Sequence, residues 1–203
     1  MAVVVICDVR GSRKIRNWGE VYSEIKKILE SVNHHFVEDF LVPMEFTVGD
    51  EFQGVLKTAD DTIEIIKILR MKMPVRFYCG IGMGNVEIPD VKGMRGEAFY
   101  RARDALNTCK NRKRDTFLIS GVDIIDISAN AIFFLIQSIE EKWTRRQREI
   151  VNFYLENPEL TYEKIGKHFG VSKQTITKIL KAARFNAIHE GESALKRLLL
   201  FVN

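Results

Sequence analysis

The sequence contains little that would cross-link the chain or anchor it in a membrane. Its 203 residues include 3 Cys, 4 Pro and 2 Trp, and the cysteines are widely spaced, with no CxxC pair. An odd and scattered set argues against a disulfide framework or a zinc site, so we interpret the cysteines as reduced packing residues. No apolar run reaches the roughly 18 residues that a membrane-spanning helix needs. We therefore expect no membrane partner.

The N-terminus lacks the basic n-region of a secretory signal. Its opening residues, MAVVVICDV, are apolar from the second position and reach Asp8 at once. This pattern is typical of a buried strand, and we expect a cytoplasmic protein. The length of 203 residues suits one large domain or two small ones.

Charge is unevenly distributed along the chain. The whole sequence has a formal net charge of +4 at pH 7. Residues 142–203 contain 12 Lys and Arg against 6 Glu and no Asp, which gives this part a net charge of +6. A basic C-terminal part on a nearly neutral body predicts contact with a polyanion.

Strand and helix patterns alternate through residues 1–125. The segments with strand patterns are 2–7, two strands within 44–56, 75–83 and 116–120. The segments with helical periodicity are 18–32, a helix that Thr58 caps and Pro74 ends, and 96–110. The order β-α-β-β-α-β-α-β predicts an α+β fold of the ferredoxin-like or palm type, in which helices cover an antiparallel-containing sheet.

We divide the chain into three parts. Residues 1–125 form the palm-type domain, residues 126–142 a connecting helix, and residues 143–203 a helix-turn-helix domain. The connecting helix is apolar, with Ser128 as its cap and a body from Ala129 to about Lys142. A tail helix at 192–200 completes the last domain or serves dimer pairing.

Acidic residues stand at the tips of two predicted strands. Asp8 closes the first strand, and Asp50 and Glu51 occupy the turn within MEFTVGDEFQGVL. If the strands are neighbours, the carboxylates converge and form a candidate site for Mg²⁺ or Mn²⁺, which one or two carboxylates hold together with substrate phosphates. The alternative is a hairpin turn that uses Gly and Asp for backbone reasons only.

A short basic loop follows the first strand. Arg10, Ser12 and Arg13 lie in it, just before a helix, and are candidates for binding the phosphates of a nucleotide. The alternative is a solvated loop. A second basic run, KNRKR at 110–114, is interpreted as a solvated turn or as an extension of a DNA or phosphate surface.

The C-terminal part has the sequence features of a helix-turn-helix. Thr144, Thr161 and Ser172 can cap three successive helices, and Gly170 permits a tight turn before the last. The outer face of that last helix carries residue types that read bases and phosphates in a major groove: Ser172, Lys173, Gln174, Thr177 and Lys178. We predict binding to double-stranded DNA as a homodimer. The alternative is a helical hairpin whose charged face meets water.

Four landmarks in order resemble the palm domain of class III nucleotidyl cyclases and GGDEF proteins. They are VVICDVRGSR, VGDEFQGVL, FYCGIGMGNVE and GEAFYRARDAL, within residues 2–120. The resemblance implies metal binding by Asp8 and Asp50. The GDEFQ hairpin, the G-x-A-x-x-x-A-R helix and the C-terminal helix-turn-helix together resemble the SatD family over nearly the whole chain.

Other cyclase positions are not matched. Phe46-Thr47 lie where an adenine-selecting Lys is common, and Tyr100 and Asp104 stand where an Asn and an Arg are expected. Arg101 and Arg103 are nearby but out of register and on different helix faces, and Arg103 is our candidate phosphate ligand. These departures favour binding over cyclisation.

The sequence therefore predicts a DNA-binding transcriptional regulator with a metal- and nucleotide-binding sensor domain. The alternative is a nucleotidyl cyclase or nucleotidyltransferase-type enzyme that acts on nucleoside triphosphates with a divalent metal. No catalytic residue is assigned. A third interpretation is a structural interaction module with a degenerate site.

Overall fold

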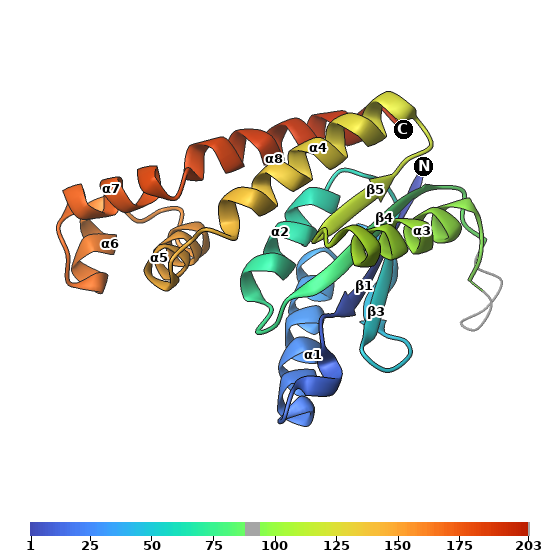
Figure 1. Ribbon diagram of the computed structural model, residues 1–203, viewed down its shortest axis with the longest axis horizontal. Helices are drawn as coiled ribbons and strands as arrows, with labels where there is room; N and C mark the ends of the chain where they lie inside the picture. The colour runs from blue at the N-terminus through green and yellow to red at the C-terminus, as the bar shows by residue number, and fades with distance from the viewer. Residues whose placement is uncertain (88–93, 203) are drawn as a thin grey trace. The chain divides into compact units, whose positions relative to one another are not determined.

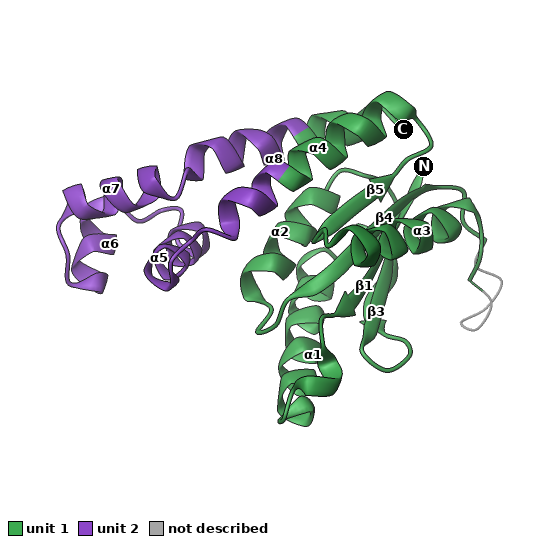
Figure 2. Ribbon diagram, in the orientation of Figure 1, with its two compact units in different colours: residues 1–134, 195–203 green, residues 135–194 purple. Residues whose placement is uncertain are grey.

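The computed structural model describes residues 1–87 and 94–202 (Figure 1). The chain forms two compact units (Figure 2): residues 1–134 together with 195–203, and residues 135–194. The boundaries fall inside two helices, α4 (Asp123–Glu140) and α8 (Phe185–Leu200). These boundaries, after residues 134 and 194, differ from the divisions at residues 126 and 143 that the sequence suggests.

The first unit alternates strands and helices in the predicted order. Its elements are β1 (Ala2–Val9), the 3-10 helix η1 (Ser12–Lys14), α1 (Trp18–His35), β2 (Phe40–Phe46), β3 (Glu51–Leu56), α2 (Thr62–Lys72), β4 (Phe77–Gly84), α3 (Glu97–Arg112) and β5 (Thr116–Ile119). The second unit contains α5 (Arg145–Glu156), α6 (Tyr162–Phe169) and α7 (Lys173–Ala182). Across the described residues there are five strands and eight α-helices, which confirms the α+β class.

The five strands form one mixed sheet in the order β2-β3-β1-β4-β5. β1 pairs antiparallel with β3 and β4, and β4 pairs parallel with β5. Asp8 lies opposite Glu51 on one neighbour and opposite Tyr78 on the other. The end of β1 and the beginnings of β3, β4 and β5 therefore share one edge of the sheet.

Helix α3 covers one face of the sheet, and glycines let it approach closely (Figure 1). A Cβ atom on Gly80 would lie 2.3 Å from the carbonyl oxygen of Ala102, and one on Gly82 would lie 2.1 Å from that of Ala98. Ala98, Ala102 and Leu106 form a buried cluster with residues of β1 and β3. The glycine-rich strand thus fixes α3 against the part of the sheet that ends at Asp8.

Gly82→Ala is expected to destabilise the protein by about 1–3 kcal/mol, because the added methyl group meets helix backbone that cannot yield without moving α3. The measurement is the free energy of unfolding in urea. Gly19→Ala is the matched control, since a Cβ atom on Gly19 in α1 has no neighbour within 4 Å and alanine favours a helix. Equal unfolding midpoints for the two variants would contradict this packing.

The structure corrects three helix starts. α4 begins at Asp123, before the predicted cap Ser128, because the carboxylate of Asp126 accepts hydrogen bonds from the Ser120 amide at 2.7 Å and hydroxyl at 2.6 Å. α2 has Asp61 as its N-cap instead of Thr58. The tail helix is also longer than expected, since α8 begins at Phe185 and not near Glu192.

The second unit is built on capped helices and a small core. Thr144 forms a capping box with Gln147, and Thr161 and Ser172 cap α6 and α7 with their side chains. The buried core residues are Ile150, Val151, Ile165, Ile176, Leu180 and Ala183.

No helix in the described part of the chain has the length and apolar character to cross a membrane.

Candidate functional site

Four acidic residues lie at the sheet edge where β1 ends. Asp8 is the next-to-last residue of β1, Glu51 begins β3, and Asp115 directly precedes β5. The carbonyl oxygen of Asp50, in the turn before β3, accepts a hydrogen bond of 3.2 Å from the amide of Val9. We call Asp8, Asp50, Glu51 and Asp115 the carboxylate edge. Its position follows from the strand order, since antiparallel neighbours end and begin at the same edge.

Two acids of this edge are paired with bases from α3. Lys110 Nζ lies 2.6 Å from Asp8 Oδ2, and the guanidinium of Arg103 donates to both oxygens of Glu51 at 2.5 and 2.7 Å. The hydrogen bond that Arg103 donates to Glu51 raises the pKa of Arg103. Arg103 and Lys110 are seven residues apart, so they lie along one side of the helix. That side is turned toward the carboxylate edge.

Asp50 and Asp115 are held by the loop after β1. Ser12 Oγ donates to Asp50 Oδ2 at 2.5 Å. Arg10 forms an ion pair with Asp115 and stacks on Tyr78, with its guanidinium carbon 4.0 Å from the ring centroid. Of the four residues predicted to bind phosphates, Arg10, Ser12 and Arg103 thus contact acids of the protein. Arg13 is exposed and makes no hydrogen bond or ion pair within the described part of the chain.

The donor set at the edge suits a hard cation. Asp8 and Asp50 lie on neighbouring segments of this edge, which the backbone hydrogen bond from the Val9 amide to the Asp50 carbonyl joins, and Mg²⁺ is commonly held by one or two carboxylates completed by water and phosphate oxygens. Glu51 is less available, because both of its oxygens accept from Arg103. No group of three or more His, Cys, Asp or Glu side chains with metal-ligand spacing occurs among residues 1–87 and 94–202.

The three cysteines lie behind this edge. Cys7 precedes Asp8 and is the register partner of Cys79, and the thiol of Cys109 donates to the Cys79 carbonyl at 3.3 Å. All three are buried and free of disulfides. Burial raises the pKa of Cys7 and Cys109, which keeps these thiols protonated and unreactive.

A second candidate site lies on α7. Gly170 ends α6 with φ +67°. Val171 and the N-cap Ser172 follow, and α7 begins at Lys173. A Cβ atom on Gly166 would lie 2.6 Å from the carbonyl oxygen of Val171, so glycine is required where the turn crosses α6. Arg146 fixes the same turn by donating to the Phe169 carbonyl at 2.9 Å.

The outer face of α7 is polar and exposed. Ile176 and Leu180 point into the core, whereas the face predicted to contact DNA is solvent-accessible: Ser172, Lys173, Gln174, Thr177 and Lys178. The Ser172 hydroxyl caps the helix by accepting from the Thr175 amide at 3.2 Å. The side chains of Lys173, Gln174 and Lys178 have no hydrogen-bond or ion-pair partner in the part of the chain that the structure describes.

Comparison with protein families covers almost the entire chain. The model of the SatD family matches residues 2–198. The chain belongs to the SatD family. No curated protein matches the sequence.

The sequence patterns indicate neither Asp115, a member of the carboxylate edge in this SatD-family protein, nor the pairing of Lys110 with Asp8. The run that contains Lys110 suggests a solvated turn or an extension of a DNA or phosphate surface. The seven-residue spacing from Arg103 to Lys110 was the available signal, because it places both on one side of the helix. Arg101 is on another face and donates to the Met83 carbonyl at 2.7 Å.

Proposed function

We propose that this SatD-family protein is a DNA-binding transcriptional regulator whose first unit binds a divalent metal and a nucleotide. The observation that carries the proposal is the outer face of α7, where Lys173, Gln174 and Lys178 are exposed without side-chain partners among residues 1–87 and 94–202, while Ile176 is buried. A face of this kind is suited to bases and phosphates, since Gln pairs bidentately with adenine and Lys reaches guanine or the backbone.

The arrangement of α6 and α7 supports a helix-turn-helix. A short α6, a left-handed glycine at Gly170 and a capped α7 follow one another, and α7 holds the place of a recognition helix. The net charge of +6 over residues 142–203 would attract the phosphate backbone. Paired half-sites favour a homodimer, because two modules together gain affinity and specificity.

The strand order β2-β3-β1-β4, with antiparallel pairs throughout, supports a ferredoxin-like, palm-type first unit. In this proposal Asp8 and Asp50 hold Mg²⁺ or Mn²⁺, which supplies charge neutralisation for the phosphates of the nucleotide. Arg13 is exposed and would contact phosphate oxygens. Arg10, Ser12 and Arg103 would join it by exchanging their present partners, Asp115, Asp50 and Glu51.

Selection from a library of randomised DNA duplexes tests the proposal. The full chain, dimeric or not, is incubated with the library at physiological salt, and bound duplexes are sequenced. The expected result is enrichment of one motif, with two related half-sites if the protein is dimeric. Binding that selects no motif and disappears at physiological salt would be the non-specific attraction of a basic surface and would contradict the proposal.

The second candidate function is nucleotide conversion. The carboxylate pair Asp8 and Asp50 favours it, because two carboxylates with a divalent metal are the common requirement of nucleotidyl transfer. Incubation with each nucleoside triphosphate and Mn²⁺, followed by chromatography, tests this function. A product formed by the wild type and absent with Asp50→Asn would establish an enzyme; unchanged triphosphates would leave binding as the role of the site.

A further inference from the structure

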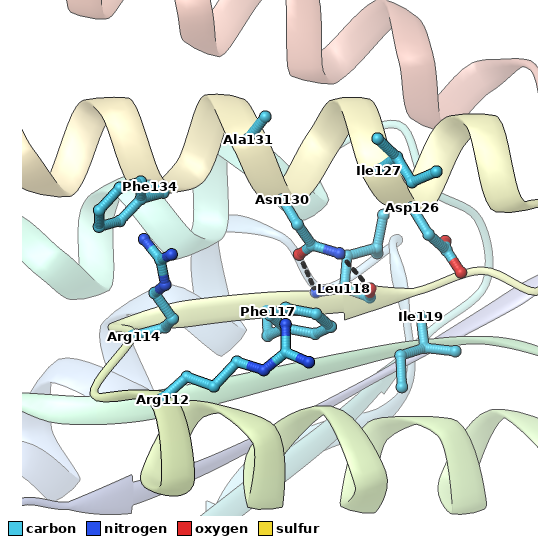
Figure 3. Close-up of a pocket in the computed structure, with 10 residues that line it drawn as sticks. All are labelled: Arg112, Arg114, Phe117, Leu118, Ile119, Asp126, Ile127, Asn130, Ala131 and Phe134. Atoms are coloured by element: carbon cyan, nitrogen blue, oxygen red, sulfur yellow. Dashed lines mark hydrogen bonds between the residues drawn. The ribbon is translucent and has the colours of Figure 1, made fainter.

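A pocket in the first unit lies apart from the carboxylate edge. It has a volume of about 440 Å³, is open to solvent, and is lined by the end of α3, by β5 and by α4 (Figure 3). The lining residues that matter for the argument are Arg112, Arg114, Phe117, Asn130, Ala131 and Phe134. The volume lies within the roughly 300–1,000 Å³ range of small-molecule sites.

Aromatic rings and guanidinium groups alternate along the pocket. The guanidinium carbon of Arg114 lies 3.1 Å from the ring centroid of Phe134, and that of Arg112 lies 5.9 Å from the centroid of Phe117. Figure 3 shows Arg114 beside Phe134 and Arg112 beside Phe117, with the helix α4 above them. The pocket thus offers two aromatic rings, each with a guanidinium group next to it.

These positive charges are not neutralised within the pocket. Neither Arg112 nor Arg114 has a carboxylate partner among the described residues, and the Nη1 atom of Arg114 is buried without an acceptor. The acid in the lining, Asp126, already accepts from the Ser120 amide and hydroxyl. A buried donor that lacks an acceptor is unfavourable, and an anionic oxygen that reached it would remove this cost.

The remaining polar side chain of the lining is also occupied. Asn130 accepts from the Leu118 amide and donates to the Leu118 carbonyl, both at 2.8 Å. These two hydrogen bonds pair the amide and the carbonyl of Leu118 in β5 and hold the Asn130 side chain in place. The donors left for a ligand are those of the two arginines.

From these contacts we infer that the pocket binds a planar aromatic anion. Its ring lies against Phe117, and its anionic group, a carboxylate or a phosphate, accepts from Arg112 and Arg114. This site is separate from the carboxylate edge, and it does not depend on metal or on the DNA-binding role of α7. Nucleotides and aromatic carboxylic acids share the required chemistry.

Calorimetric titration of the full chain, without divalent metal, tests the inference. The probes are adenosine 5′-monophosphate, salicylate, adenosine and inorganic phosphate. At least one of the two aromatic anions, adenosine 5′-monophosphate or salicylate, should bind. Adenosine has the ring without the charge and inorganic phosphate has the charge without a ring, so each should bind at least tenfold more weakly. Whichever of the two aromatic anions binds with the higher affinity indicates whether the ligand of the pocket is a nucleotide or an aromatic acid.

Variants assign the binding to this pocket. Arg112→Gln combined with Arg114→Gln should weaken binding of that aromatic anion at least tenfold, because both charges are lost. Ala131→Phe keeps the charges and fills the pocket from α4, so it should produce a similar loss. Asp50→Asn, at the carboxylate edge, and Arg16→Gln, in the loop before α1, should leave the affinity unchanged. Melting temperatures verify that each variant is folded.

Three outcomes would overturn the inference. One is the absence of binding by both aromatic anions at millimolar concentration. Another is binding that is equal for phosphate and the aromatic anions, which would indicate only attraction to charge. The third is an affinity that folded Ala131→Phe retains or that Asp50→Asn abolishes, since the ligand would then occupy a different site.

Discussion

Replacement of Lys173 and Gln174 together by alanine is expected to weaken binding to the selected DNA duplex by about a hundredfold. A bidentate contact from Gln to adenine contributes about 1–3 kcal/mol of discrimination, and each 1.4 kcal/mol is about a tenfold change in affinity. Lys173 adds a contact to phosphate or guanine. Both side chains are exposed and have no partner within the part of the chain that the structure describes, so their removal should cost the fold almost nothing.

Fluorescence anisotropy at several salt concentrations measures this effect and separates the two residues. Lys173→Ala alone should weaken binding to all duplexes and reduce the slope of log affinity against log salt by about 1 if the lysine contacts phosphate. Gln174→Ala alone should keep the slope and relax the preference at one base pair. Lys26→Ala is the matched control, because Lys26 is an exposed lysine on α1. Equal affinity of the double variant and the wild type would contradict the role of α7.

Asp50→Asn and Lys110→Ala are expected to change the affinity for Mn²⁺ in opposite directions. Loss of the Asp50 carboxylate removes a proposed ligand and should weaken binding by at least the roughly 10–100-fold that loss of an outer-shell partner costs. Lys110 lies 2.6 Å from the Asp8 carboxylate. Its ammonium group neutralises the negative charge of the Asp8 carboxylate, which would attract the metal. Lys110→Ala should therefore strengthen Mn²⁺ binding several-fold.

Electron paramagnetic resonance of free Mn²⁺ during titration gives these affinities without nucleotide. Asp104→Asn is the control, since Asp104 is an exposed acid on α3 and forms no hydrogen bond or ion pair with the carboxylate edge within the described residues. Weakened binding in both Asp50→Asn and Lys110→Ala would mean that the effects come from local structure. Equal Mn²⁺ affinity in all variants would exclude Asp50 as a ligand.

The first strand and the capped helices could be predicted from sequence because their signals are local. The run from Val3 to Cys7 is buried on both sides, as an uninterrupted apolar segment suggests. Thr144 and Ser172 make the backbone contacts that their positions next to helical patterns imply. In each of these cases the residues that determine the structure are neighbours along the chain.

The pairing of charges at the sheet edge was harder to predict because it depends on tertiary structure. Asp8 and Lys110 are 102 positions apart, and Arg10 and Asp115 are 105 apart. Their meeting requires the strand order and the close approach of α3 over Gly80 and Gly82. The start of α4 was missed for a related reason, since Asp126 bonds to Ser120 through a turn that periodicity does not reveal.

If the first unit acts as the sensor of the proposed regulator, a metal-bound nucleotide there should change DNA binding by the second unit. The most direct measurement is the affinity of the full chain for its selected duplex with and without Mn²⁺ and each nucleoside triphosphate, in the wild type and in Asp50→Asn. The account predicts that one nucleotide changes the wild-type affinity about 5–150-fold, the usual range of allosteric coupling, and leaves that of Asp50→Asn unchanged. Identical DNA affinities with and without a nucleotide that demonstrably binds would contradict it.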